Sequence, residues 1–221
     1  MDLIGTVLPL AIVIGLSPLP IMPAILLLMT PRARVNGFAF LGAWLVGLTL
    51  LVLLTVVLAT LSGPSDATEQ GVGWIQLLTG LAFLGLAAVK WLRRPRPGGP
   101  AKAPGWLTAL TSYEPRQSAR LGAALAMGNP KNIAMALAAG AEIAYLAQDA
   151  AAMTVGVVAF VLISTIGVGT PILLFAVAGE RARPALERGR AWLERNSTAL
   201  GVGVLVVLGV LLVLKGLPSA V

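Results

Sequence analysis

The feature that most limits how this chain can fold is a polar segment, Gly128–Asn132, inside a long apolar run. The run extends from about Ala119 to Leu146, and the segment within it reads Gly-Asn-Pro-Lys-Asn. A charge at the centre of a bilayer costs at least ~2.5 kcal/mol, and a proline removes one hydrogen bond from a helix. The sequence therefore predicts a helix that breaks at Asn129-Pro130, with Lys131 in the first turn after the break.

Composition predicts an integral membrane protein. Of the 221 residues, 57% are hydrophobic and 11% are charged, which is too apolar for a soluble domain and leaves room for several membrane-spanning helices. The formal net charge is +7, but the cations lie in short loops between apolar runs, where anionic lipid and topology explain them better than nucleic acid does. We therefore expect membrane lipids as partners and no nucleic acid.

The chain has no cysteine and no histidine. This excludes disulfides, thiol redox chemistry and the commonest transition-metal ligands. Clustered carboxylate pairs and a nucleotide-binding P-loop are also absent from the sequence, so the usual acid/base and ATP-driven arrangements are missing. We expect no metal, no other cofactor and no enzymatic activity. A lysine or serine could still act in an intramembrane enzyme, so that class stays open as an alternative.

Six apolar runs predict six membrane-spanning helices. Pro18, Pro20 and Pro23 predict that the first of them is broken near its middle. Ser, Thr, Gly and Pro residues inside the fifth run predict a bent, partly polar helix. The predicted spans cover residues up to about Met29 and then about Gly37–Leu61, Val72–Leu92, Ala119–Leu146, Met153–Ala178 and Ala199–Leu214.

The positive charges fall on one side of the predicted membrane. Fourteen of the sixteen Lys and Arg residues lie in or beside the loops that follow the first, third and fifth spans. The positive-inside rule places these three loops in the cytoplasm and both termini outside. We therefore expect a multi-pass protein of the cell inner (plasma) membrane, with both termini on the extracytoplasmic side.

The chain divides into two halves of similar size. Residues 93–118 form a basic segment rich in Pro and Gly, which predicts an extended cytoplasmic linker. The three spans in 1–92 and the three in 119–221 must then lie in opposite orientations, so the halves form an inverted repeat. The apolar stripe of residues 180–195 fits either a helix on the membrane surface or a solvated connector. The predicted fold is all-α, with six transmembrane helices in two inverted three-helix repeats and with helices one and four broken.

The centres of the two broken spans predict a binding site. Each carries a polar residue followed by proline, Ser17-Pro18 in the first and Asn129-Pro130 in the fourth. Ser and Asn are good N-caps, and proline is well tolerated at the first helical position, so each pair predicts the start of a half-helix. Both half-helices would begin near the midplane with their positive dipole ends there, and Lys131 adds a full charge.

The predicted midplane site binds an anionic group such as a carboxylate, phosphate or sulfate. The alternative is that the prolines only kink the helices for packing and that Lys131 snorkels or forms a structural pair. The substrate-binding residues expected at this site are Ser17, Pro18, Asn129, Pro130, Lys131 and Asn132.

Glu142 and Thr170 are candidate coupling or gating residues. Glu142 lies on roughly the same helical face as Lys131 but ~16 Å along the axis, so the two side chains cannot pair in a straight helix. It serves either as an outer-gate or proton-coupling carboxylate or as a structural residue at an interface. Thr170 is one of the polar residues inside the fifth span.

The residues around both predicted breaks resemble those of a known family. The stretch Ala126–Asn132, followed by Ala138-Ala139-Gly140, is similar to the Asn-Pro-Lys signature that opens the second repeat of the lysine exporter (LysE) superfamily. Ser17-Pro18-Leu19-Pro20 resembles the first-repeat motif of that superfamily, and the six-span length matches along nearly the whole chain. The Asn-Pro-Lys-Asn form and the small residues after it are most similar to the GAP branch, the glycolipid- and sulfolipid-addressing proteins.

The resemblance implies a homodimeric transporter, or a transport component, built from inverted three-helix repeats. The chain departs from the metal-ion branches, because no aspartate lies within a span, and only Glu142 could attract a cationic side chain there. The expected function is outward movement of an anionic or zwitterionic substrate, a cell-envelope lipid or its precursor. The alternatives are an exporter of amino acids or small metabolites and a non-transporting scaffold that serves an envelope-lipid pathway through its basic linker.

Overall fold

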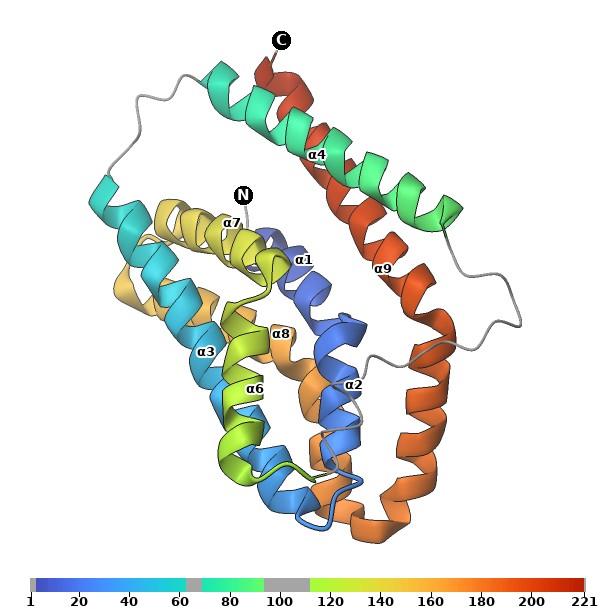
Figure 1. Ribbon diagram of the computed structural model, residues 1–221. Helices are drawn as coiled ribbons and strands as arrows, with labels where there is room; N and C mark the ends of the chain where they lie inside the picture. The colour runs from blue at the N-terminus through green and yellow to red at the C-terminus, as the bar shows by residue number, and fades with distance from the viewer. Residues whose placement is uncertain (1–2, 63–68, 94–111, 221) are drawn as a thin grey trace. The chain divides into compact units, whose positions relative to one another are not determined.

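The computed structural model of the protein describes residues 3–62, 69–93 and 112–220. This part of the chain is built from helices joined by short connections and contains no strand, so the predicted all-α class is confirmed. The helices are α1 (Leu3–Gly15), α2 (Pro18–Leu27), α3 (Ala33–Ser62), α4 (Glu69–Leu92), α6 (Pro115–Met127), α7 (Pro130–Leu146), α8 (Ala150–Ala178), the short 3-10 helix η2 (Gly179–Ala182) and α9 (Arg183–Ala220) (Figure 1).

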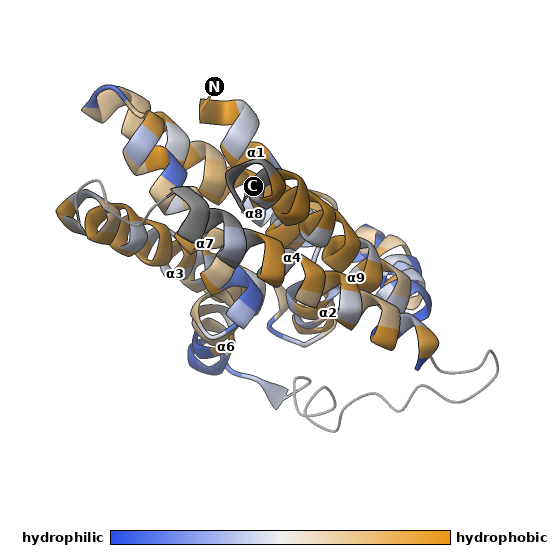
Figure 2. Cartoon of the chain, turned by 90° about the horizontal axis from the view of Figure 1, so that it is seen from above, coloured by the Kyte–Doolittle hydropathy of each residue, from blue (hydrophilic) through white to orange (hydrophobic). Residues whose placement is uncertain are grey.

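Two helical stretches are long and apolar enough to cross a membrane, Ala33–Leu61 and Ala150–Leu214, and the bent pair of α1 and α2 is a third candidate. Apolar residues predominate along α3 and α9, as the hydropathy colours of Figure 2 show, and many of their large apolar side chains are exposed. On α3, for example, Val46 and Leu54 are 58% and 56% exposed. Outward-facing apolar surface of this extent is what helices in contact with lipid tails present.

The predicted breaks lie where the prolines placed them. Helix α1 ends at Gly15 and α2 starts at Pro18, with an angle of 53° between the two. Helix α6 ends at Met127 and α7 starts at Pro130. In both cases the second helix has proline at its first position, because the missing N–H costs nothing there.

Two other segments differ in extent from their predictions. Helix α6 already starts at Pro115, inside the predicted linker 93–118, and most of the rest of that linker lies outside the described residues. Residues 180–195 belong to η2 and to the first part of α9, which continues without interruption to Ala220. Their apolar stripe is covered by protein, since Leu186 and Leu193 are only 3% and 7% exposed.

The helices form two compact units, and each unit takes helices from both halves of the chain. The larger unit consists of Met1–Leu61 and Ala103–Trp192, and the smaller of Ser62–Lys102 and Leu193–Val221. The larger unit therefore holds the first two predicted spans of each half, and the smaller unit holds the third. In the smaller unit α4 crosses α9 closely, because a Cβ on Gly80 would lie 2.8 Å from the Gly209 carbonyl oxygen.

In the larger unit, α3 of the first half packs along the broken helix of the second half. The backbone of Phe40 touches Gly122 of α6 so closely that no Cβ would fit there. About four turns further along α3, Thr55 Oγ1 donates a hydrogen bond to the Ala136 carbonyl of α7 at 2.9 Å. Helix α3 thus follows α6 and α7 in the same direction.

The reciprocal arrangement places α8 of the second half along the broken helix of the first half. Gly156 lies beside Leu3, whose Cδ2 would be 3.3 Å from a Cβ added to the glycine. Gly167 lies beside Ile21, whose Cδ1 would be 2.9 Å from a Cβ added there. Helix α8 therefore follows α1 and α2 in the same direction. The sequence predicted an inverted pair of halves but not this exchange of helices between them.

The contact between α6 and α3 should be sensitive to a single methyl group. A Cβ on Gly122 would overlap the backbone of Phe40, whereas a Cβ on Gly42 of α3 meets nothing within 4 Å. We expect Gly122→Ala to lower the free energy of unfolding by about 1–3 kcal/mol, the usual cost of overpacking. Gly42→Ala should leave it unchanged or raise it by up to ~1 kcal/mol, because alanine is the better helix former. Thermal unfolding in detergent measures both, and equal stability of the two variants would contradict the packing described here.

Candidate functional site

The first break leaves the Val13 carbonyl of α1 without its helical partner. Pro18 has no N–H, so the Ile14 carbonyl accepts from the Ser17 N–H instead, at 3.1 Å. The Ser17 N–H would otherwise have bonded the Val13 carbonyl, as the i to i−4 pattern of an α-helix requires. Val13 is buried, and its free carbonyl oxygen must find a partner elsewhere.

That partner is the side chain of Lys131. Its Nζ donates a hydrogen bond to the Val13 carbonyl oxygen at 2.7 Å, across 118 positions of sequence. Lys131 is the second residue of α7, directly after the second break. The two breaks, which the sequence could only group by topology, therefore lie together in the larger unit.

Asn129 caps the helix that carries Lys131. Its backbone is extended, with φ −83° and ψ 116°, and its side-chain Oδ1 accepts from the Lys131 N–H at 3.0 Å. The N-cap role predicted for Asn129 is thus present. Ser17 has the corresponding extended backbone before α2, but no hydrogen bond from its side chain caps that helix.

Asn132 closes the end of α6. Its Nδ2 donates to the Leu125 and Ala126 carbonyl oxygens at 3.0 and 3.1 Å. These are two of the last carbonyls of α6, which have no helical partner because the chain breaks at Gly128. Asn132 is 0% exposed, so water does not satisfy these groups. The first turn of α7 therefore supplies donors to the carboxyl ends of both α1 and α6.

The donors left for a ligand at this crossing are few. Pro18, Pro20 and Pro130 have no N–H, and the Lys131 N–H is already bonded to Asn129. The Lys131 ammonium carries three N–H groups, and two of these have no partner among the described residues. Its charge and the positive dipole ends of α2 and α7 would favour an anionic group at this crossing.

Ser164 of α8 is a polar residue that lies at the first break. Its closeness to that break could not be predicted from the sequence. Its carbonyl oxygen would lie 3.6 Å from a Cβ on Gly15, and its side chain is 0% exposed. The Ser164 Oγ and the Asn132 Oδ1 are buried without a hydrogen-bond partner in the part of the chain that the structure describes. The only signal in the sequence was a serine inside an apolar span.

The family model described as Sap, sulfolipid-1-addressing protein, matches residues 7–218. The chain belongs to the sulfolipid-1-addressing protein family. This confirms the expected assignment to the glycolipid- and sulfolipid-addressing branch, and the match includes both breaks. No curated protein and no solved structure matches the chain.

In this sulfolipid-1-addressing family member, the two candidate coupling residues are not brought to Lys131 by any contact among the described residues. Glu142 is eleven residues beyond Lys131 on α7, ~16 Å along the helix axis. Thr170 is exposed, and its Oγ1 donates to the Ile166 carbonyl of its own helix at 2.6 Å. A coupling or gating role for either residue stays a prediction.

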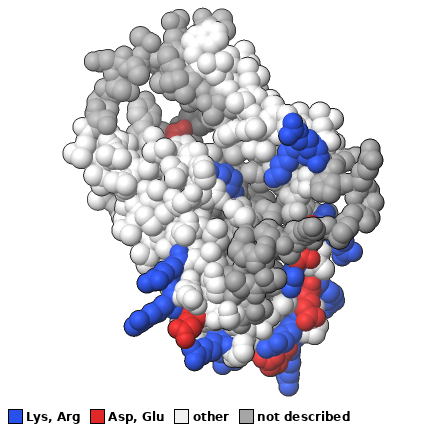
Figure 3. Space-filling view, viewed as in Figure 1, with Lys and Arg blue, Asp and Glu red and all other residues white. Residues whose placement is uncertain are grey.

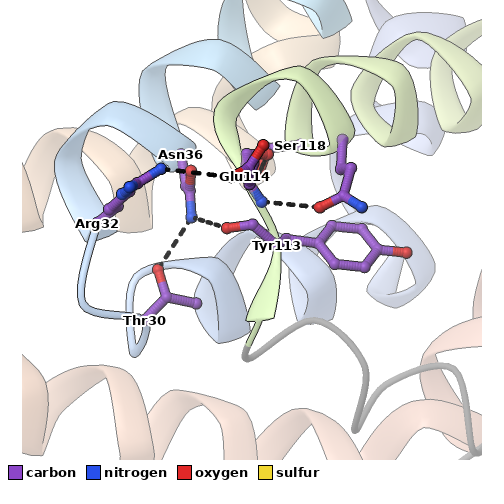
Figure 4. A network of polar contacts seen from close by, with 7 residues as sticks. Thr30, Arg32, Asn36, Tyr113, Glu114 and Ser118 are labelled. Carbon is purple, nitrogen blue, oxygen red and sulfur yellow. Dashed lines mark hydrogen bonds and ion pairs between the residues drawn. The ribbon is translucent and has the colours of Figure 1, made fainter.

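A second polar cluster, the Asn36 junction, joins the end of α2 to the start of α6 (Figure 4). The Asn36 side chain is 0% exposed. Its Nδ2 donates to Thr30 Oγ1 at 3.1 Å and to the Tyr113 carbonyl oxygen at 2.8 Å. Nothing in the sequence points to this cluster, because Asn36 stands next to a basic turn, where a polar residue is expected to be exposed. The junction consists of Thr30, Arg32, Asn36, Tyr113, Glu114 and Ser118.

The rest of the junction fixes the start of α6. Glu114 and Gln117 form a capping box, in which the Glu114 N–H donates to Gln117 Oε1 at 2.8 Å. Ser118 Oγ donates to the Glu114 carbonyl at 3.1 Å. The ion pair of Arg32 with Glu114, at 3.8 Å, is about two-thirds exposed on both sides and contributes at most ~1 kcal/mol.

The capping of α6 by Asn132 predicts a stability cost for its removal. Asn132→Ala leaves the Leu125 and Ala126 carbonyls without a donor, the second of them buried, so we expect it to lower the free energy of unfolding by about 1–3 kcal/mol. The control is Thr60→Ala, which removes an exposed hydroxyl bonded only to the Val57 carbonyl of its own helix and should change stability by less than ~0.5 kcal/mol. Unfolding in detergent measures both variants. An Asn132→Ala protein as stable as Thr60→Ala would contradict the capping role.

Proposed function

We propose that this protein is a component of a membrane transport system that moves an anionic or zwitterionic substrate, a cell-envelope lipid or its precursor, outward across the plasma membrane. The observation that carries the proposal is the meeting of the two breaks, with Lys131 Nζ 2.7 Å from the Val13 carbonyl oxygen. Transporters built from inverted repeats bind substrates and ions where broken helices meet near the midplane. Membership of the sulfolipid-1-addressing family supports an envelope-lipid pathway.

The proposed architecture is the six-span inverted repeat of the LysE superfamily. The exchange of α3 and α8 supports it, because a two-fold axis in the membrane plane requires that each half treat the other in the same way. The composition of the two units supports it too, since each takes corresponding helices from both halves. The length of α4, 24 residues, corresponds to ~36 Å and is sufficient for one crossing.

The proposed orientation places the Arg32 end of the larger unit in the cytoplasm. Exposed charged side chains gather at this end, over the α2–α3 turn, the start of α6 and η2 (Figure 3). The ion pair of Arg32 with Glu114 puts the end of α2 beside the start of α6. The first broken helix therefore ends at this side of the unit and the second begins there, so their chain directions are opposite. The amino end of α1 then faces the extracytoplasmic side, as the positive-inside rule predicted.

Substrate binding in this proposal changes the partner of Lys131. A carboxylate, phosphate or sulfate oxygen is a stronger acceptor for an ammonium group than a neutral carbonyl is. When Lys131 turns to such a group, the Val13 carbonyl loses its donor, and the first break must rearrange or admit water. Binding at Lys131 and a change of shape at the first break are therefore coupled. In this proposed function the chain makes no covalent bond, needs no cofactor and has no enzymatic role. The homodimer implied by the resemblance is also part of the proposed function.

The test compares cells that carry the intact protein, no protein, or Lys131→Ala at matched membrane levels. Loss of a charge-assisted hydrogen bond of about 1.5–3 kcal/mol weakens substrate binding about ten- to a hundredfold, so we expect Lys131→Ala to reproduce the null phenotype. The control is Lys90→Ala, which removes an exposed lysine from α4 and should behave as wild type. The readout is the distribution of extractable envelope lipids between the cell interior and the outer surface.

If Lys131→Ala exports as the wild type does while the null strain fails, the proposed transport site is wrong. Deletion within the basic linker 93–118 would then test the scaffold alternative. If the retained compound is a small metabolite and the envelope lipids are unchanged, the assignment of a lipid substrate is wrong while the site stands.

A further inference from the structure

We propose that Asn36 is a latch that holds the Arg32 end of the larger unit closed, and that its release opens a water path from that end to the two breaks. The inference rests on the proposed function, in which this path leads from the cytoplasm to the substrate site. It adds a gating residue that lies outside the predicted site.

The latch ties the two halves of the chain through one buried side chain. Asn36 Nδ2 uses both of its N–H groups, one for Thr30 Oγ1 and one for the Tyr113 carbonyl oxygen. Thr30 Oγ1 in turn donates to the Leu27 carbonyl, in the last turn of α2, at 2.7 Å. A continuous chain of hydrogen bonds thus joins the carboxyl end of α2 to the residue before the α6 cap. Figure 4 shows its links from Thr30 through Asn36 to Tyr113.

The segments joined by Asn36 are those that must separate for access to the breaks. Helices α2 and α6 are the parts of the two broken helices that lie between the breaks and the Arg32 end. They run antiparallel beside one another, so a path from this end to Lys131 requires the end of α2 and the start of α6 to move apart. The bridge through Asn36 opposes that movement directly.

The hydrogen bond that this movement would break is the one from Asn36 to the Tyr113 carbonyl. The first turn of α3 is also tied to the end of α8, because an Arg34 terminal nitrogen lies 3.4 Å from the Ala176 carbonyl oxygen. Helix α8 follows α1 and α2 along their length, as described above. Helix α3 also packs on α6 further along, where Phe40 touches Gly122. The start of α6, before Gly122, is therefore the part that moves, and the contact of Asn36 with Tyr113 is the one that opens.

The chemistry of the junction fits a reversible closure. The Asn36 Oδ1 is buried without a partner among the described residues, which penalises the closed state, whereas in the open state water reaches this oxygen. The neighbouring ion pair of Arg32 and Glu114 is largely exposed and adds little to closure. The buried amide is therefore the polar group on which closure depends, and part of its bonding is recovered when water enters.

The chain has no cysteine, so single introduced cysteines can report opening. Ser118→Cys reports at the junction, Ser164→Cys reports at the first break, and Ala139→Cys reports from α7 beyond the breaks; all three positions are 0% exposed. Each reporter is combined with Asn36 or with Asn36→Ala in membrane vesicles. The measurement is the labelling rate with a membrane-impermeant maleimide, added to the face that carries Arg32.

We expect Asn36→Ala to raise the labelling rate of both Ser118→Cys and Ser164→Cys about tenfold or more, and to leave Ala139→Cys within about twofold. The factor follows from the loss of two hydrogen bonds, each of modest net strength. Asn36→Asp, whose carboxylate cannot donate, should act in the same way. Arg32→Ala should leave all three rates within about twofold, because it removes only the exposed ion pair.

Three results would overturn the latch. Faster labelling of Ser118→Cys alone would show local fraying of α6 with no path to the breaks. Unchanged rates at both reporters would show that Asn36 does not control closure, and a faster rate at Ala139→Cys as well would show that Asn36 holds the whole unit together. Labelling requires no substrate, so the latch can fail while transport through Lys131 stands. Labelling only from the opposite face would contradict the proposed orientation and leave the latch in place.

Discussion

The constraint on which the rest of this structure depends is that no backbone group at a helix break can be left unpaired inside an apolar layer. An unpaired carbonyl in hydrocarbon costs several kcal/mol. The carbonyl freed at the first break, that of Val13, is paired by the Lys131 side chain. Two of those freed at the end of α6, the Leu125 and Ala126 carbonyls, are paired by Asn132. Both donors lie in the first turn of α7, so this one turn supplies hydrogen bonds to backbone carbonyls at both helix breaks.

This solution makes the two halves of the chain depend on one another. Because the donor for the first break comes from the second half, neither half is complete by itself. The exchange of α3 and α8 has the same effect, since each packs along the broken helix of the other half through contacts such as Gly122 with Phe40 and Gly156 with Leu3. A movement of one half relative to the other must therefore change the pairing at the breaks, which is the property expected of a site that binds and releases a substrate.

The sequence predicted the local features of the fold and of the site, because single residues dictate them. Pro18 and Pro130 set both breaks, and Asn129 caps α7 as its residue type favours. The partner of Lys131 could not be predicted, because it is a backbone carbonyl 118 positions away, and every residue carries a carbonyl. The burial of Asn36 could not be predicted either, because it depends on α6, which is distant in the sequence, packing beside it. The apolar stripe of residues 180–195 gave no sign of whether lipid or protein would cover it.

The most direct test of how the two halves pack on one another beside the second break is a disulfide between α3 and the end of α6. A Cβ on Gly47 would lie 3.0 Å from the Ala126 Cβ, within a small shift of disulfide geometry. Gly47→Cys with Ala126→Cys should link in the monomer on mild oxidation, with the joined peptides identified by mass spectrometry, while Gly42→Cys with Ala126→Cys should not. Absence of the first link, or equal linking of both pairs, would contradict the packing of α3 along the broken helix of the second half, and with it the exchange of helices between the halves.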